Sequence, residues 1–159
     1  MFSIASGVLA LAFAAYAAKR VGSADPGPER VQEMSNIIHG GAMTFLFREY
    51  KVLIPFVIVV TAILVWKVSL NTAISFVSGA FCSALAGFAG MSIATRTNGR
   101  TAYAATQGVA PALRIAFLGG TVMGMSVVGL GILGVAILYS IFGDPNIING
   151  VGFGASSIA

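Results

Sequence analysis

Residues 115–143 read IAFLGGTVMGMSVVGLGILGVAILYSIFG and contain no Asp, Glu, Lys or Arg. A helix that crosses a bilayer needs about 20 consecutive apolar residues, and this stretch exceeds that length. It predicts a transmembrane helix over residues 114–142. The helix is followed by Gly143-Asp144-Pro145-Asn146, a strong turn sequence.

The whole chain has the composition of a membrane protein. Of its 159 residues, 57% are hydrophobic and 9% are charged, whereas soluble domains contain about 45–50% apolar and about 25% charged residues. The mean hydropathy of +0.93 agrees. We therefore predict an all-α fold, a polytopic membrane helix bundle that forms a single membrane domain over residues 1–159. It comprises about four complete transmembrane helices plus the start of a fifth.

Charged residues separate the other apolar runs. The remaining spans are expected at about residues 2–18, 46–67, 72–95 and 147–159. The last run is too short to cross a bilayer, so we expect the sequence to be cut inside a fifth span. Residues 29–45 predict an amphipathic cytoplasmic helix, which either packs against the bundle or acts as a regulatory surface helix.

Basic residues gather on one side of these spans. The first and third loops and their flanks hold eight of the nine, namely Lys19, Arg20, Arg30, Arg48, Lys51, Arg96, Arg100 and Arg114. Since cytoplasmic loops carry the excess of Lys and Arg, the N-terminus is expected outside, in the plasma or inner membrane of a prokaryote. The first run also looks like a signal peptide, but its basic residues follow it, which favours a retained helix.

Several kinds of chemistry are excluded. With one cysteine, Cys82, and one histidine, His39, the chain has neither a disulfide framework nor a multi-His or multi-Cys metal site. We expect Cys82 to be a small packing residue and His39 to be solvated at the interface, not a catalytic base. The sequence contains no phosphate-binding loop motif. Its nine Lys and Arg form no basic stripe, so no nucleic-acid partner is expected.

The acidic residues are expected outside the uncharged parts of the spans. They are Asp25, Glu29, Glu33, Glu49 and Asp144. Proton and sodium relays need a carboxylate within the membrane. On this placement the chain is not a rotor subunit of a rotary ATPase.

Small residues recur at helical spacing in two spans. Gly79, Ser83 and Gly87 form one row, and Gly120, Gly124, Gly131 and Gly134 lie along the next span. Such rows let helix backbones approach closely. They predict helix packing in preference to a glycine-lined pore.

The most polar feature is the cluster Arg96, Asn98, Arg100 and Thr101, expected in the third loop. Two interpretations remain open. The cluster binds an anion or lipid head groups, or it only satisfies the charge asymmetry and ends the third span.

Four stretches together resemble the membrane-bound, ion-translocating pyrophosphatases. They are HGGAMTFLFREYK (residues 39–51), ATRTNGRTA (94–102), FLGGTVMG with VVGLG (117–124 and 127–131) and GFGASSIA (152–159). His39 replaces the usual Glu of that family, and Phe45 and Glu49 replace Tyr and Gln. The resemblance covers the chain from about residue 29 to its end.

The resemblance implies a role in an ion pump. Members of that family are single chains with many more spans, form homodimers, and couple hydrolysis of magnesium-bound pyrophosphate to transport of protons or sodium ions. Their Mg²⁺ and substrate ligands lie on core helices that begin with the fifth span. No catalytic, cofactor-binding or metal-binding residue is therefore assigned to this chain.

Two functions from different classes remain. The chain is the N-terminal, outer-helix part of such a pump, without the substrate site and inactive alone, or it is a small structural or assembly membrane protein with no enzyme activity. The run that stops in mid-span favours the first.

Overall fold

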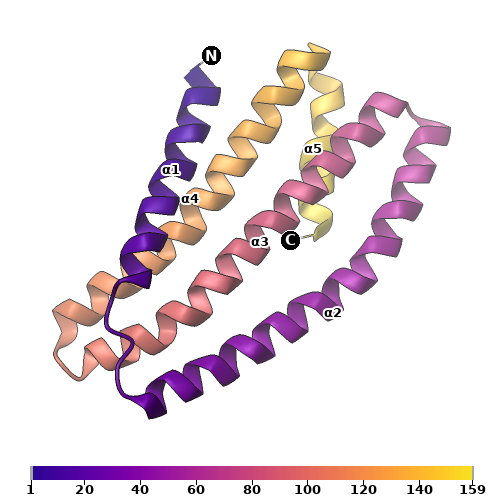
Figure 1. The fold of residues 1–159 in the computed structure, drawn as a ribbon. Helices are drawn as coiled ribbons and strands as arrows, with labels where there is room; N and C mark the ends of the chain where they lie inside the picture. Colours follow the sequence, from indigo (N-terminus) through magenta and orange to yellow (C-terminus); the bar gives the residue numbers. More distant parts are fainter. Residues whose placement is uncertain (1, 159) are drawn as a thin grey trace.

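The structure, a computed structural model, describes residues 2–158. Five α-helices follow one another in this range (Figure 1): α1 (Phe2–Gly22), α2 (Glu29–Lys67), α3 (Leu70–Ala105), α4 (Val109–Phe142) and α5 (Pro145–Ile158). The first four are long and apolar enough to cross a membrane. No strand occurs among the described residues. The predicted all-α membrane bundle is confirmed.

Helix α3 is the centre of the arrangement. It packs against α2, α4 and α5, whereas α1 packs against α4. The helices alternate in direction, so that the connections after α1 and α3 lie at one end of the bundle and those after α2 and α4 at the other (Figure 1). Helix α2 bends away from the others along its length and has Pro55 inside it.

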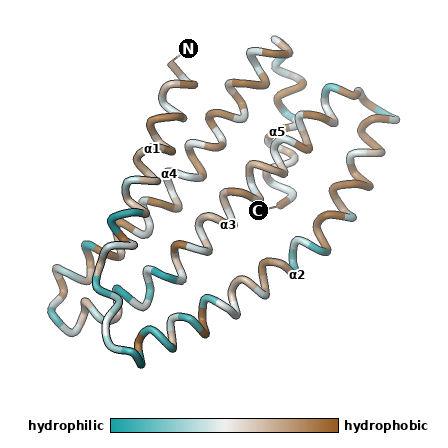
Figure 2. Tube along the Cα trace, in the orientation of Figure 1, coloured by the Kyte–Doolittle hydropathy of each residue, from teal (hydrophilic) through white to brown (hydrophobic). Residues whose placement is uncertain are grey.

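Two helices, α2 and α3, extend far beyond the apolar runs that predicted them. Residues 29–45 and 46–67 form one continuous helix, α2. Residues 96–105, expected in a loop, complete α3, which is 36 residues long. At about 1.5 Å per residue α3 is about 54 Å long, far more than the roughly 30 Å of a hydrocarbon core. Figure 2 shows the consequence, hydrophilic residues gathered at the end of the bundle where α2 begins and α3 ends.

The connections are set by local capping. The Ser69 side chain accepts a hydrogen bond from the Thr72 amide at 3.1 Å and starts α3. Gly143, with a φ of 65°, ends α4 in the left-handed conformation that favours glycine. Gly27 has a φ of 79°, and its amide donates to the Asp25 carboxylate at 2.9 Å.

Close backbone contacts hold two helix pairs together. Gly7 of α1 and Gly129 of α4 are both buried. A Cβ atom added to Gly7 would lie 3.2 Å from the Gly129 carbonyl oxygen, and one added to Gly129 would lie 3.1 Å from the Gly7 oxygen. Packing of this kind replaces the hydrophobic effect as the force between helices in lipid.

The α3–α5 crossing is built in the same way. A Cβ on Gly79, Gly150 or Gly154 would meet backbone atoms of the facing helix. The rings of Phe76 and Phe153 lie beside this crossing, with centroids 5.4 Å apart.

The glycine row expected in the fourth span is only partly correct. A Cβ on Gly120, Gly124 or Gly131 would meet nothing within 4 Å, whereas Gly119 and Gly129 face neighbouring helices closely. Of the expected row only Gly134 has a neighbour, since its Cβ would lie 3.4 Å from Cys82 Sγ, and the glycines that pack closely, Gly119 and Gly129, were not part of that row.

Candidate functional site

The predicted polar cluster is divided between two environments. All four of its residues lie on the last three turns of α3 and not in a loop. Arg96 and Arg100 line a cavity of about 290 Å³ between α3 and the beginning of α2. Asn98 and Thr101 are not part of its lining. Only the two arginines, one helical turn apart, face a candidate site.

Arg100 is engaged with backbone carbonyls. Its Nε donates to the Ala24 oxygen at 3.1 Å, and Nη2 donates to Gly22 at 3.3 Å. Its Nη1 donates to the Arg96 oxygen, also at 3.3 Å. Gly22 ends α1, and the last carbonyls of a helix have no partner within it. Arg100 therefore fastens the α1–α2 connection to α3.

His39 joins α2 to α3. Its Nδ1 lies 2.7 Å from the Thr95 hydroxyl. The same hydroxyl lies 2.8 Å from the Met91 carbonyl oxygen of its own helix, and the tautomer of the imidazole decides which group donates in the His39–Thr95 pair. The ring is half-buried. The bond to Thr95 was not expected, and it forms because α3 continues as a helix alongside this part of α2.

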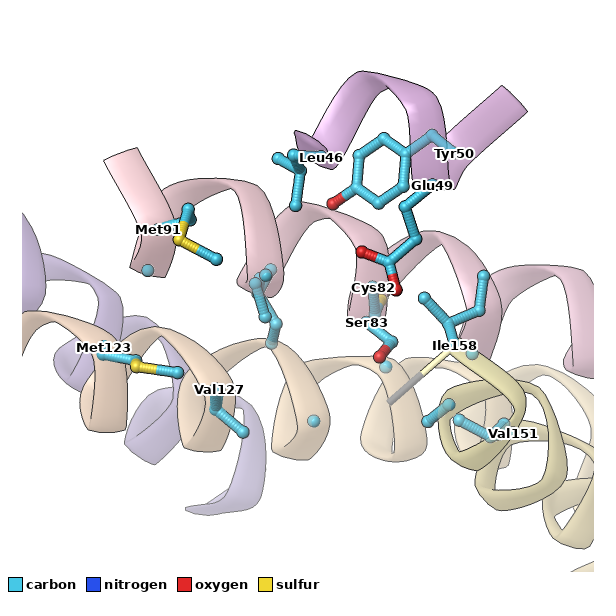
Figure 3. A pocket seen from close by; sticks show the side chains of 18 of the residues that line it. Leu46, Glu49, Tyr50, Cys82, Ser83, Met91, Met123, Val127, Val151 and Ile158 are labelled. Carbon is cyan, nitrogen blue, oxygen red and sulfur yellow. The ribbon is translucent and has the colours of Figure 1, made fainter. Parts of the chain in front are cut away.

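A second, larger cavity of about 500 Å³ opens where α2 leaves the other helices (Figure 3). Residues of α2, α3, α4 and α5 line it, and most are glycine, alanine or aliphatic. We call it the apolar cleft. Cys82 is one of its lining residues and is half-buried. A surface of this composition suits contacts with lipid chains or other helices.

Glu49 is the exception in the apolar cleft. Figure 3 shows its side chain extending from α2 toward Cys82 and Ser83 of α3. The neighbouring Tyr50 hydroxyl donates to the Ala84 carbonyl at 2.6 Å, which places this part of α2 level with the middle of the predicted 72–95 span. That no carboxylate lies within a span stays a prediction, and Glu49 is the residue on which it depends, because it lies inside the expected span 46–67.

Magnesium ligation does not fit either cavity. Mg²⁺ takes oxygen ligands, mostly carboxylates, phosphates and water. Within residues 2–158 no group of three or more His, Cys, Asp or Glu side chains is placed to hold a metal ion. Among the described residues, Glu49 is the one carboxylate that lines the apolar cleft, and no carboxylate lines the smaller cavity. That no catalytic, cofactor-binding or metal-binding residue lies in this chain stays a prediction.

Comparison with known proteins identifies close relatives. A family model described as inorganic H+ pyrophosphatase matches residues 8–159. A protein from Clostridium tetani that bears the name of a K(+)-stimulated pyrophosphate-energized sodium pump is 50% identical over 160 residues, covering 100% of this chain and 24% of its own length. A K(+)-insensitive pyrophosphate-energized proton pump from Methanosarcina mazei is 39% identical over 156 residues, covering 97% of this chain and 23% of its own length.

A third relative, from Thermotoga maritima, is a K(+)-stimulated pyrophosphate-energized sodium pump. It is 42% identical over 138 residues, covering 86% of this chain and 19% of its own length. The chain thus spans about a quarter or less of the length of these relatives. With its four membrane-length helices, it is a multi-pass membrane protein.

Proposed function

Because the chain belongs to the inorganic H+ pyrophosphatase family, we propose that it forms the outer, supporting helices of a pump that couples pyrophosphate hydrolysis to proton or sodium transport. The observation that carries the proposal is the match itself, which extends over residues 8–159 and includes both sodium and proton pumps. It supports a part of an ion pump over a small structural or assembly protein.

The composition of the apolar cleft agrees with a structural role for these helices in the pump. Pyrophosphate with magnesium brings several negative charges and hard cations, which need carboxylates for the metal and Lys or Arg for the phosphates. The cleft offers small and aliphatic side chains and one carboxylate. Its glycine-rich wall suits further helices of the whole protein. In this proposal the magnesium and pyrophosphate sites, and the contacts of a homodimer, belong to the rest of the pump.

The first test is a segment exchange. The matching quarter of the Clostridium tetani relative is replaced by this chain, and pyrophosphate-driven ion uptake is measured in inverted vesicles. We expect uptake and hydrolysis to be retained. The matched control carries Gly79→Leu in the exchanged segment, which forces α3 and α5 apart and is expected to reduce both. A chimera that inserts at normal levels yet neither hydrolyses pyrophosphate nor transports ions would contradict the proposal.

The second test uses the purified 159-residue chain. We expect no magnesium-dependent pyrophosphate hydrolysis from it. Robust hydrolysis would show that the chain itself holds the substrate site and would overturn the supporting role.

We also propose that the N-terminus lies outside a prokaryotic plasma membrane and the α1–α2 and α3–α4 connections inside. The helix ends beside these two connections carry six of the nine Lys and Arg, in accord with the positive-inside rule; they are Lys19, Arg20, Arg30, Arg96, Arg100 and Arg114. In a Cys82→Ala background, Ser3→Cys should react with a membrane-impermeant maleimide in intact cells, and Thr106→Cys only after lysis. The reverse pattern would refute this orientation.

A further inference from the structure

The cavity between α2 and α3 has a polar lining of one charge sign. Its polar side chains are Gln32, Ser35, Asn36 and His39 of α2 and Arg96 and Arg100 of α3. We call this cavity the arginine pocket. No Asp or Glu belongs to its lining. Two guanidinium groups within one helical turn, with no carboxylate between them, leave a positive charge that the lining does not neutralise.

The lining divides into engaged and available groups. Arg100 is bound to three carbonyl oxygens, Gln32 donates to the Gly27 oxygen at 2.8 Å, and His39 is bonded to Thr95. Within residues 2–158 the side chains of Arg96, Ser35 and Asn36 form no hydrogen bond or ion pair. These three bring a guanidinium, a hydroxyl and an amide to the same cavity.

The arginine pocket lies beside a close contact between α2 and α3. A Cβ added to Gly99 would lie 2.8 Å from both Cβ and Oγ of Ser35, so α2 and α3 are in close contact beside the cavity. The His39–Thr95 hydrogen bond ties the same two helices one turn further along. The two helix backbones that carry the available donors are therefore held in place before any ligand arrives, which reduces the entropy lost on binding.

We propose that the arginine pocket binds a phosphate group. Guanidinium is the side chain whose planar donors match phosphate oxygens in pairs, and Ser35 and Asn36 add donors from the opposite helix. The volume, about 290 Å³, is that of a small-ligand site. This inference does not depend on the pump assignment.

Two sources carry this chemistry, an anionic phospholipid and a soluble phosphate. Beside the pocket α2 exposes apolar side chains, among them Met34 at 56% and Ile38 at 50%. They provide a surface for acyl chains next to the pocket, as for basic pockets that bind lipid head groups.

The test uses the 159-residue chain in a non-ionic detergent. One arm adds phosphatidylglycerol or phosphatidylcholine and measures retained lipid by native mass spectrometry. The other arm measures binding of radiolabelled inorganic phosphate by equilibrium dialysis. Phosphatidylglycerol retained in preference to phosphatidylcholine identifies a lipid source, whereas phosphate binding without lipid retention identifies a soluble anion. Either result supports a phosphate site.

Substitution locates the site. Loss of a hydrogen bond to a charged group predicts binding about tenfold or more weaker in Arg96→Gln, and a smaller loss in Asn36→Ala. The Arg96 guanidinium has no bond to the described part of the chain, so circular dichroism should show unchanged helix content. The matched control is Arg114→Gln, which removes an exposed arginine of α4 outside the pocket and should keep binding within about twofold of the unmodified chain. The proposal fails if neither probe binds, or if Arg96→Gln and Arg114→Gln weaken binding equally.

Discussion

Replacing Gly79 by alanine probes the α3–α5 crossing with a single added carbon. The new Cβ would lie 2.8 Å from the carbonyl carbon and 2.9 Å from the Cα of Val151, and nearer still to the carbonyl oxygen. Non-bonded carbon atoms prefer about 3.5–4.0 Å, so the two carbon contacts alone require α5 to move away by about 0.6–1.2 Å, and the nearer oxygen sets this as a minimum. Backbone atoms block the space, and no side-chain rotation relieves the overlap.

The size of the effect follows from a matched pair of variants. An extra carbon forced into a packed contact costs about 1–3 kcal/mol, while alanine gains about 1 kcal/mol over glycine in helix propensity. In Gly87→Ala, two turns along α3, the new Cβ lies 3.5 Å from the Tyr50 hydroxyl, an ordinary contact. The propensity gain is common to both variants and cancels. The difference between them is the strain alone, about 1–3 kcal/mol.

The assay is unfolding in mixed micelles by titration with sodium dodecyl sulfate, followed by circular dichroism. A second measurement is the rate at which Cys82 reacts with a maleimide, because Cys82 lines the apolar cleft beside α5. We expect a lower unfolding free energy and faster labelling in Gly79→Ala than in Gly87→Ala. If Gly79→Ala is as stable as Gly87→Ala and its Cys82 reacts no faster, α5 does not pack on α3 as described.

Three further predictions concern single side chains. Tyr50→Phe removes the hydroxyl bonded to Ala84 at 2.6 Å and should lower the unfolding free energy by about 0.5–1.5 kcal/mol in the same titration; an unchanged midpoint would contradict the bond. Arg100→Lys keeps the charge, but a lysine cannot reach all three carbonyls. The α1–α2 connection should then be looser, and endoproteinase Asp-N should cut before Asp25 faster in this variant than in Arg114→Lys. Equal cleavage rates would count against the fastening role. Glu49→Gln removes a charge from the apolar cleft and should raise the unfolding midpoint. Glu33→Gln, at the polar end of α2, is the control and should leave the midpoint unchanged. A lower midpoint in Glu49→Gln would mean that the carboxylate has a stabilising partner.

The sequence was sufficient for the order of the four long apolar helices and the short fifth one, but not for the continuity of residues 29–45 with 46–67. Apolar runs report which residues lie in lipid, and Ser69 and Gly143 report where helices start and stop. The polar ends of α2 and α3 could not be read in this way. Hydropathy decides where a helix leaves the bilayer, but backbone hydrogen bonding decides where the helix ends. Residues 96–105 are mostly polar and still continue α3 as a helix.

Side-chain partners were harder to predict than helices. The bond between His39 and Thr95 depends on which face of α2 meets which face of α3, and one sequence does not contain that rotation. The direction of the Glu49 side chain could not be predicted for a related reason, since a carboxylate between Arg48 and Lys51 looks like part of an interfacial cluster until the tilt of α2 is known. The two arginines of the pocket were recognised as notable residues. The α2 residues that share the pocket with them had no feature in the sequence that marked them, apart from being polar.

The hydrogen bonds of Arg100 also constrain the order in which the chain can fold during synthesis. Its partner Ala24 precedes it by 76 residues, and ribosomes add about 5–20 residues per second, so the carbonyls at the end of α1 are made about 4–15 s before the side chain that will satisfy them. Until then they must remain where water reaches them. The α1–α2 connection is consequently fastened only after the apolar part of α3 has been made.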